Sequence, residues 1–275
     1  MNRRLLLLST LSIGLASLFA SGAAQAEDAA LKAAVSGAQR TPAFAARDGF
    51  RHPAATLEFF GIKPNQTVVE LIPGGGWWTE ILAPYVREKG QLIEAGNDPD
   101  ATGDGARRAA ARFKAKLDAA PAVYDRVKIG VFDAENGKFD LGAPGSADLV
   151  LTFRNIHNWV PLGEDKTRAA FRAMFTVLKR GGVLGVEEHR LPASRPQDKE
   201  ASTGYLHEAY VIQMAESVGF KLAGRSEINA NPKDTADHPN GVWALPPTYA
   251  NKDQDRAKYE AIGESDRMTL KFVKP

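Results

Sequence analysis

The sequence predicts an α/β domain in which helices cover both faces of a mostly parallel, seven-stranded sheet. Two observations support this fold class. Short β-branched and apolar segments alternate with helical segments, and regular alternation of this kind implies a parallel sheet. The first strand also runs directly into a cluster of glycines, which is typical of the ligand crevice of such sheets. With 275 residues, 44% of them hydrophobic and 25% charged, the chain has the length and composition of one globular domain.

Each element follows from its own residues. Thr67-Val68-Val69-Glu70-Leu71-Ile72 is a β-branched run after a turn, which is typical of a buried parallel strand. Further strands are predicted at 91–95, 126–132, 147–153, 182–187, 220–227 and 268–273. Helices are predicted from His52-Pro53 through Phe60 and at 77–88, 106–119, 164–179 and 205–218. The stretch 229–255 is rich in Pro, Asn and Asp, and it is predicted to be a long surface loop.

The first 26 residues have the features of a cleavable signal peptide. Arg3 and Arg4 precede an apolar run from Leu5 to Phe19, and Ala24-Gln25-Ala26 is a small-x-small cleavage site. The run is shorter than the roughly 20 residues that span a bilayer, so we expect cleavage after Ala26, a periplasmic or secreted product and no membrane span afterwards. The paired arginines also partly resemble a twin-arginine signal, which exports folded proteins.

Two parts follow the predicted leader. Residues 27–60 are predicted to form a helical lead-in, and residues 61–275 form the main domain. Within the lead-in, residues 27 to about 46 are expected to be loosely packed or an exposed arm, with no evident chemistry. The leader contains two arginines and no acidic residue, so its removal lowers Lys+Arg from 35 to 33 against 33 Asp+Glu, a net charge of zero. A neutral chain lacks the positive field that nucleic acids or anionic membranes require. We therefore expect a small-molecule partner, with the oligomeric state left open. Cysteine is absent, which excludes disulfides and cysteine ligands.

The glycine loop is the most informative segment. Gly74, Gly75 and Gly76 lie between the strand 67–72 and the helix predicted at 77–88. Glycines allow the backbone to approach a ligand closely, and a helix start presents free N–H groups. A phosphate-binding loop would need Gly-Lys-Ser/Thr, which is missing, and a dinucleotide fingerprint would need a glycine where Thr79 stands. A purely structural turn remains the alternative.

At this point the sequence resembles the class I S-adenosylmethionine-dependent methyltransferases. Glu70, Gly74 and Gly76 match the first motif of that family, with Ile72 in place of its first glycine. Phe132-Asp133-Ala134, the strand 147–151 and the turn 178–184 match later motifs in order. The resemblance covers roughly residues 67–273 and implies a Rossmann-like methyltransferase fold. A narrower resemblance, to exported predicted methyltransferases, rests on segments such as Arg51-His52-Pro53 and Glu188-His189-Arg190.

The resemblance also implies S-adenosylmethionine as the cofactor. The residues that it assigns to cofactor binding are Glu70, Gly74, Gly75, Gly76, Asp98 and Asp133. Asp133 would approach the adenine. The family's ribose-binding acid aligns with Gly96, and Asp98 lies just beyond it, so the ribose contact departs from the family pattern.

Polar residues follow two strands at the rim where this family places substrate contacts. Asn155 and His157 come after the strand 147–153, and Glu188 and His189 come directly after the strand 182–187. These four are the predicted catalytic residues, because histidine is suited to accept a proton near neutral pH. Packing at a helix start is the alternative for His157. His157, His189 and His207 show no local ligand spacing, so no metal is expected.

These observations favour an S-adenosylmethionine-dependent methyltransferase that acts on an unidentified small molecule. The alternative is a non-catalytic ligand-binding protein that keeps the methyltransferase fold, as the departures at Ile72 and Gly96 would suggest. A nicotinamide-dependent oxidoreductase is the weakest of the three hypotheses.

Overall fold

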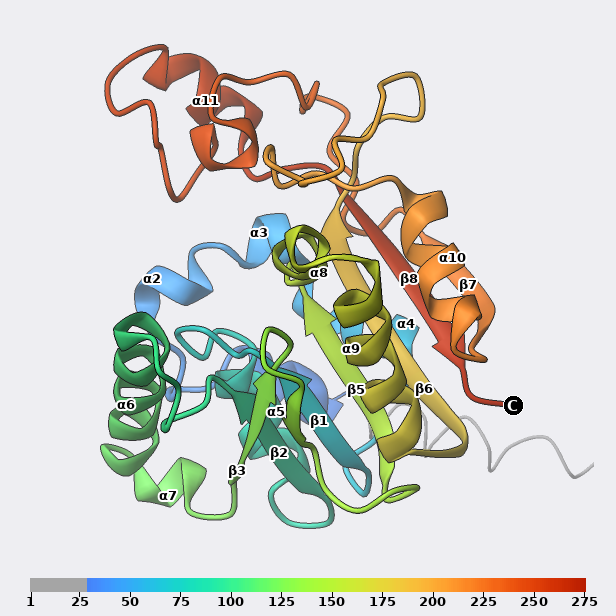
Figure 1. Cartoon of the computed structure of the whole chain (residues 1–275). Helices are drawn as coiled ribbons and strands as arrows, with labels where there is room; N and C mark the ends of the chain where they lie inside the picture. Colours follow the sequence, from blue (N-terminus) through green and yellow to red (C-terminus); the bar gives the residue numbers. More distant parts are fainter. Residues whose placement is uncertain (1–28) are drawn as a thin grey trace, which may run out of the picture.

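A computed structural model describes residues 29–275, and the predicted leader lies outside this range (Figure 1). All seven predicted strands are present in one sheet of eight. The strands are β1 (Thr67–Leu71), β2 (Gln91–Gly96), β3 (Lys128–Asp133), β4 (Lys138–Asp140), β5 (Ala147–Phe153), β6 (Leu178–His189), β7 (Lys221–Ser226) and β8 (Arg267–Val273). The additional strand, β4, has three residues and forms an antiparallel edge on β3. A segment this short has no periodicity from which a strand can be predicted.

The strand order places a crevice at the centre of the sheet. The order is β4-β3-β2-β1-β5-β6-β8-β7, and β3, β2, β1, β5 and β6 run parallel. β8 runs antiparallel between β6 and β7. The chain proceeds outward from β1 to β3 and then returns to β5 beside β1, so the order reverses between β1 and β5. The carboxyl ends of the strands at such a reversal form the ligand crevice of open α/β sheets.

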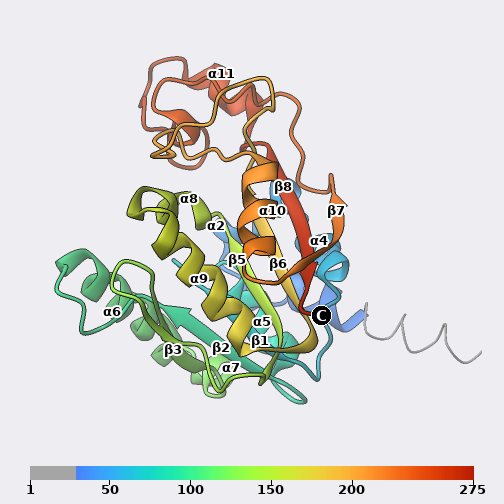
Figure 2. The same cartoon turned by 45° about the vertical axis from the view of Figure 1, so that its right-hand side comes forward.

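Helices cover both faces of this sheet (Figures 1 and 2). They are α2 (Pro42–Ala45), α3 (Asp48–Arg51), α4 (Pro53–Phe60), α5 (Thr79–Val86), α6 (Asp104–Asp118), α7 (Pro121–Tyr124), α8 (Ile156–Trp159), α9 (Glu164–Val177), α10 (Glu208–Ser217) and α11 (Arg256–Ile262), with short 3-10 helices η1 (Val160–Leu162) and η2 (Gly241–Ala244). Successive residues of β1 point to opposite faces. Val69 belongs to the core formed with α9 and α10, whereas Val68 packs in the core formed with α4 and α5.

The lead-in packs against the domain. Residues 29–35 are helical, Leu31 is buried among side chains of α5, and both the backbone N–H and the hydroxyl of Thr41 donate to Glu80 on α5. The expectation of loose packing was therefore wrong, because alanine-rich composition hides the few residues that anchor the segment. Among the described residues, no helix has the length and apolar character needed to cross a membrane.

The stretch 229–255 has no strand and a single short helix, η2, as predicted for a long loop, but several of its side chains are buried. This stretch folds with residues 191–207 and α11 into a cap, defined here as residues 191–207 and 227–266, above the carboxyl end of β6 and the amino end of β8 (Figure 1, orange and red). The buried carboxylate of Asp234 accepts hydrogen bonds from the hydroxyl of Tyr205 and from the backbone N–H of Asp266, and it also bonds Nε2 of His238. Proline, asparagine and aspartate here shape turns and a buried polar network rather than mark solvent exposure.

Candidate functional site

The three glycines of the loop have different surroundings. Gly74 has a φ of +59°, and a Cβ atom built there meets nothing within 4 Å. A Cβ on Gly75 would lie 3.3 Å from Cζ of Phe44, and one on Gly76, whose φ is +82°, would lie 2.8 Å from Cε of Lys116. Gly75 and Gly76 are therefore needed for close packing against the lead-in and α6, whereas Gly74 borders open space.

Ile72 adopts an unusual backbone conformation at the end of β1. Its φ is +47°, in the left-handed region that a β-branched side chain rarely occupies. The Ile72 N–H donates to the carbonyl oxygen of Ala95 at 2.8 Å, which holds the turn in place. The sequence resemblance places a glycine at this position, and glycine would adopt the left-handed φ found here without the strain that isoleucine carries.

A cavity of about 330 Å³, called here the Asp133 cavity, lies at the strand-order reversal. Its walls come from the ends of β1, β2, β3 and β5, and they include Ile72, Asp98, Asp133, Asn155 and Asn158. Lys138 donates to both oxygens of Asp98, at 2.8 and 2.7 Å, and these bonds lower the pKa of Asp98. The carboxylate of Asp133 accepts from the backbone and side-chain nitrogens of Asn136. Two of the residues assigned to the cofactor therefore lie in one cavity wall.

Glu70 occupies a different place. Its side chain is buried beneath the glycine loop, where it accepts a hydrogen bond of 3.0 Å from the hydroxyl of Thr79, and it does not line the Asp133 cavity. Its position supports the start of α5 rather than direct contact with a ligand.

Another cavity, of about 430 Å³, lies between α6 and the sheet, with Gly74 and Gly96 in its wall. Most of its surface is apolar, and its charged lining groups are Arg107 and Lys114. It contains no carboxylate that could bind ribose hydroxyls. The smaller Asp133 cavity is the better candidate for a nucleoside because it combines acids with the apolar ring of Phe132 and opens at the strand-order reversal.

A third cavity, about 350 Å³, lies between the sheet and the cap. It is called here the His157 cavity. One side of it is lined by three arginines, Arg47, Arg51 and Arg154, and also by His157, Asn158 and His189. The cap closes the other side with Val242, Trp243, Pro246, Pro247, Thr248, Glu264 and Ser265. Asn158 also lines the Asp133 cavity, so the two cavities meet at this side chain.

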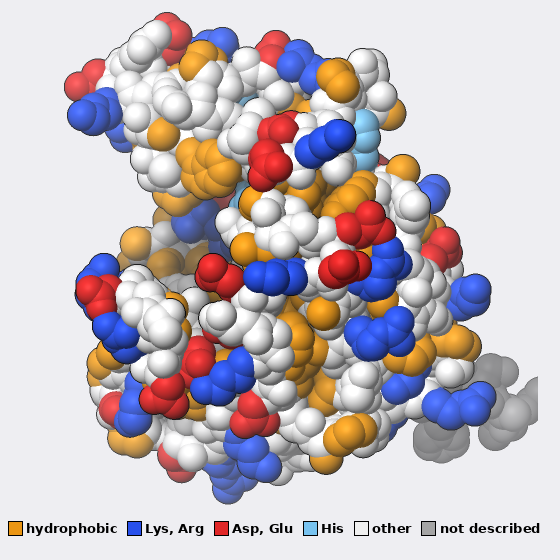
Figure 3. Space-filling view, in the orientation of Figure 1, with side chains coloured by type: hydrophobic (Ala, Val, Ile, Leu, Met, Phe, Trp, Pro, Cys, Tyr) orange, Lys and Arg blue, Asp and Glu red, His pale blue; other side chains and the backbone are white. Residues whose placement is uncertain are grey.

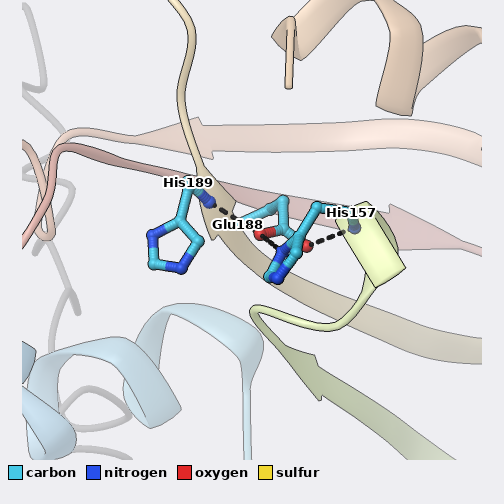
Figure 4. A group of neighbouring side chains, drawn as sticks. All are labelled: His157, Glu188 and His189. Atoms are coloured by element: carbon cyan, nitrogen blue, oxygen red, sulfur yellow. Dashed lines mark hydrogen bonds and ion pairs between the residues drawn. The ribbon is translucent and has the colours of Figure 1, made fainter. Parts of the chain in front are cut away.

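His157, in the wall of this cavity, forms a buried pair with Glu188 (Figure 4). Nδ1 of His157 lies 2.9 Å from Oε1 of Glu188, whose side chain is fully buried. The Glu188 carboxylate also accepts from the backbone N–H groups of Ile156, at 2.7 Å, and of His189, at 2.9 Å. With Nδ1 donating to the carboxylate, the neutral imidazole keeps Nε2 as its proton acceptor. This arrangement fits a general base whose ring is oriented by a carboxylate.

His189 has a different environment. Its Nδ1 lies 2.6 Å from the hydroxyl oxygen of Ser265, and its ring centroid is 5.3 Å from that of His157. Burial and the nearby His157 and Arg154 lower the pKa of His189 well below its usual range. His189 is therefore uncharged near neutral pH and is a weaker proton acceptor than an ordinary histidine.

The fourth predicted catalytic residue, Asn155, lies in the wall of the neighbouring Asp133 cavity. Its Nδ2 donates to the carbonyl oxygen of Leu71 at 2.9 Å, which ties the end of β5 to the end of β1. The structure thus brings His157, Glu188 and His189 together and separates Asn155 from them.

The same three residues could also be considered as metal ligands, because their candidate ligand atoms lie within 4.8 Å of one another. The hydrogen bonds argue against that use. Both oxygens of Glu188 already accept backbone N–H groups, and the arginines of the cavity would repel a divalent cation. His207 is not part of the group, since its Nε2 bonds the carbonyl oxygen of Arg195.

Several lining residues were not predicted. Arg47 and Arg51 come from the later part of the lead-in, and Trp243, Glu264 and Ser265 come from the cap. Arg51 stands in the Arg51-His52-Pro53 segment, which was the one sequence signal near this group. No local spacing links the cap residues to His157, because only the tertiary fold brings them together.

No family model and no curated protein matches this chain. Solved structures do match. An S-adenosylmethionine-dependent methyltransferase from Aquifex aeolicus has a TM-score of 0.55 and 12% identity, covering 90% of this chain and 98% of that chain. The glycopeptide N-methyltransferase MtfA has a TM-score of 0.52 and 16% identity, with 86% and 100% covered. The cyclase SpnF has a TM-score of 0.56 and 15% identity, with 91% and 95% covered.

At these identities the likeness establishes the fold. The chain has the Rossmann-like fold of class I S-adenosylmethionine-dependent methyltransferases, with β4 added to the seven predicted strands. A cyclase of the same fold shows that the architecture carries more than one chemistry, so the activity has to be argued from the site.

Proposed function

We propose that this protein is an S-adenosylmethionine-dependent methyltransferase that acts on a small molecule. The observation that carries the proposal is the junction at Asn158. One cavity that it lines holds the acids expected beside a nucleoside, and the other holds a histidine oriented by a buried carboxylate. Methyl transfer requires this adjacency, because donor and acceptor must meet in line across a short distance.

The donor cavity offers two acids to the cofactor: Asp98 would face the ribose hydroxyls, and Asp133 would face the adenine. Gly74 lies in the wall of the adjoining cavity between α6 and the sheet, which shares Asn97 with the donor cavity, and its open surroundings leave room for close approach of the rest of the cofactor. S-adenosylmethionine, when bound, supplies a sulfonium-activated methyl group, which bonds to the acceptor as its carbon–sulfur bond breaks and the electron pair returns to sulfur.

The chain's own residues prepare the acceptor. His157 takes the proton that the acceptor's hydroxyl, thiol or amino group loses, and Glu188 stabilises the resulting imidazolium. The cap and α3 line opposite sides of the His157 cavity, so they shield the reacting groups from part of the bulk water.

Calorimetric titration of the mature protein with S-adenosylmethionine and S-adenosylhomocysteine tests this proposal directly. We expect both nucleosides to bind at micromolar to sub-millimolar concentration, with competition between them. Absence of binding by either one at millimolar concentration would contradict a methyltransferase.

That negative result would favour the alternative, a non-catalytic ligand-binding protein. Two observations motivate it. Lys138 already engages Asp98, and Ile72 replaces the first glycine of the family motif. A protein of this kind would bind a ligand in the His157 cavity without any dependence on S-adenosylmethionine.

We also propose that the protein works outside the cytoplasm, in the group of exported proteins that its sequence resembles. The support is the leader sequence, with Arg3 and Arg4, the apolar run and the Ala24-Gln25-Ala26 site.

A further inference from the structure

We propose that the His157 cavity binds a small organic acid with an apolar body, whose carboxylate is held by Arg47, Arg51 and Arg154. The inference rests on the proposed function, because it names the class of the methyl acceptor. Its physical basis is the set of guanidinium groups that converge on one cavity (Figure 3 shows Lys and Arg side chains recessed in the hollow below the cap).

The three arginines reach the cavity from separate parts of the chain. Arg47 precedes α3, Arg51 ends α3, and Arg154 follows β5 with a left-handed backbone, φ +59°. Arg51 is only 4% exposed. A solvated surface cluster would not need such placement, whereas guanidinium groups held at a cavity wall are well suited to bind a carboxylate.

Each arginine keeps donors free for a ligand. Nε of Arg47 and Nε of Arg51 bond Glu264, at 2.6 and 3.1 Å, and Nη1 of Arg154 bonds Glu187 at 2.8 Å. Within residues 29–275, no hydrogen bond uses the terminal nitrogens of Arg47 or Arg51, or Nη2 of Arg154. These unused donors can form the paired N–H···O contacts of an arginine–carboxylate fork.

The local charge leaves room for one negative charge. Arg47, Arg51, Arg154 and Arg267 face three carboxylates, Glu187, Glu188 and Glu264, which leaves an excess of one positive charge when both imidazoles are uncharged. Burial and the charge of Arg154 lower the pKa of Arg51 to about 8. A bound monoanion would relieve this repulsion, and a single carboxylate matches the excess better than a dianionic phosphate.

The opposite wall of the cavity accommodates the apolar body of the bound acid. Trp243 is 37% exposed, and its ring lies 6.0 Å from the His157 ring in an edge-on arrangement. Val242, Pro246 and Pro247 extend this apolar surface. An acid with an apolar or aromatic body would therefore rest on the cap, with its anionic end at the arginines and its nucleophile near His157.

The test uses acids and their neutral amides as matched probes. Benzoate, 4-hydroxybenzoate, phenylacetate and succinate are each compared with the corresponding amide, by thermal shift and then by calorimetry on the mature protein. We expect at least one acid to bind ten times or more tightly than its amide, and to bind less tightly at high salt. Equal binding of acids and amides, or no binding of any acid at 10 mM, a concentration of about a hundred times a 0.1 mM Kd, would overturn the proposal.

Arginine variants locate the binding site. Arg47→Gln and Arg154→Gln are chosen because their side chains are partly exposed and because Glu264 and Glu187 each keep Arg267 as a partner. Each variant should weaken acid binding about tenfold or more, the loss expected for a charge-assisted hydrogen bond. Arg126→Gln is the matched control, since Arg126 is exposed and lies just before β3, away from the cavity. A similar loss in the control, or no loss in either cavity variant, would contradict the assignment.

The outcomes distinguish this inference from the proposed function. Arginine-dependent acid binding without any binding of S-adenosylmethionine would uphold the acid site and contradict the methyltransferase. Binding of S-adenosylmethionine together with equal affinity for acids and amides would support the methyltransferase and contradict the acid site.

Discussion

Glu70 on β1 lies opposite Glu94 on β2 in the parallel register, and both side chains are buried. Neither carboxylate oxygen of Glu94 has a hydrogen-bond donor among the described residues. Burial raises the pKa of Glu70 to about 7, and burial together with the charge of Glu70 raises the pKa of Glu94 well above its usual range. Two adjacent buried carboxyl groups therefore keep at least one proton between them at neutral pH.

The shared proton predicts a specific pH dependence of stability. A carboxyl whose pKa is raised by folding binds more protons in the folded state, so stability falls as pH rises from about 4.5 through about 7. Glu94→Gln removes the share of this loss that Glu94 contributes, whereas the burial that raises the pKa of Glu70 remains. We expect the variant to match the native protein at pH 4.5 and to exceed it at pH 8 by on the order of 2 kcal/mol in urea unfolding. Glu88→Gln, at an exposed position, should show no such divergence, and parallel pH curves for native protein and Glu94→Gln would refute the pairing.

The His157–Glu188 pair predicts a separation between rate and donor affinity. His157→Gln should lower the rate of S-adenosylhomocysteine formation, with the acid that binds best, by on the order of 10²–10⁴. The affinity for S-adenosylmethionine should stay nearly constant. His189→Gln should lower the same rate by less than about tenfold, because His189 is uncharged and hydrogen-bonded to Ser265. Equal losses in both variants, or parallel loss of donor binding, would show a structural role instead.

The reaction should not depend on a metal ion. Dialysis of the mature protein against EDTA is expected to leave both acid binding and the methyl-transfer rate unchanged, since the oxygens of Glu188 are bound by backbone N–H groups. Loss of activity after dialysis, with recovery on addition of zinc, would instead assign His157, Glu188 and His189 as ligands.

The open space beside Gly74 predicts where the donor lies. Gly74→Val should weaken binding of S-adenosylmethionine by more than tenfold, which is about 1.4 kcal/mol. A left-handed backbone strains valine anywhere, so Gly145→Val is the matched control, because Gly145 has a φ of +67° and equally open surroundings away from the cavities. Comparable affinity of both variants in calorimetry would rule out this placement.

Export can be examined through the leader. We expect the mature product to begin at Glu27, as determined by N-terminal sequencing of the exported protein. Changing Arg3 and Arg4 together to lysine keeps the positive charge, so a general secretory signal should still work. Failure of the double variant would indicate the twin-arginine route, and an uncleaved native product retained in the cytoplasm would contradict the signal peptide.

The sheet could be predicted from sequence because the patterns that indicate its strands and helices lie within short segments of the chain. β-branched runs such as 67–72 and glycine-terminated helices carry their own periodicity, and the glycine loop marks the crevice. The cap could not be predicted in this way. Asp234, Tyr205 and His238 form a buried network, although Tyr205 lies 29 residues before Asp234 in the sequence. Each of these polar residues, taken alone, resembles a surface residue.

The candidate site likewise contains residues that local sequence patterns predict and residues that only the tertiary fold brings together. His157 and Glu188 follow predicted strand ends, and the parallel topology of β5 and β6 places them together. Glu70 has the right motif position but is directed beneath the loop, where Thr79 and Glu94 surround it. Arg47 has no motif at all, since its role depends on Glu264, 217 residues further along the chain.

The ion pairs of Glu264 with Arg47 and Arg51 join the two ends of the described chain across the cavity. Arg267, on the last strand of the sheet to be synthesised, bonds both Glu264 and Glu187. The cavity is thus completed late, after nearly every residue has left the ribosome. A chain that crosses a membrane unfolded would have no acid-binding surface in transit, and it would capture its ligand only from the compartment where folding finishes.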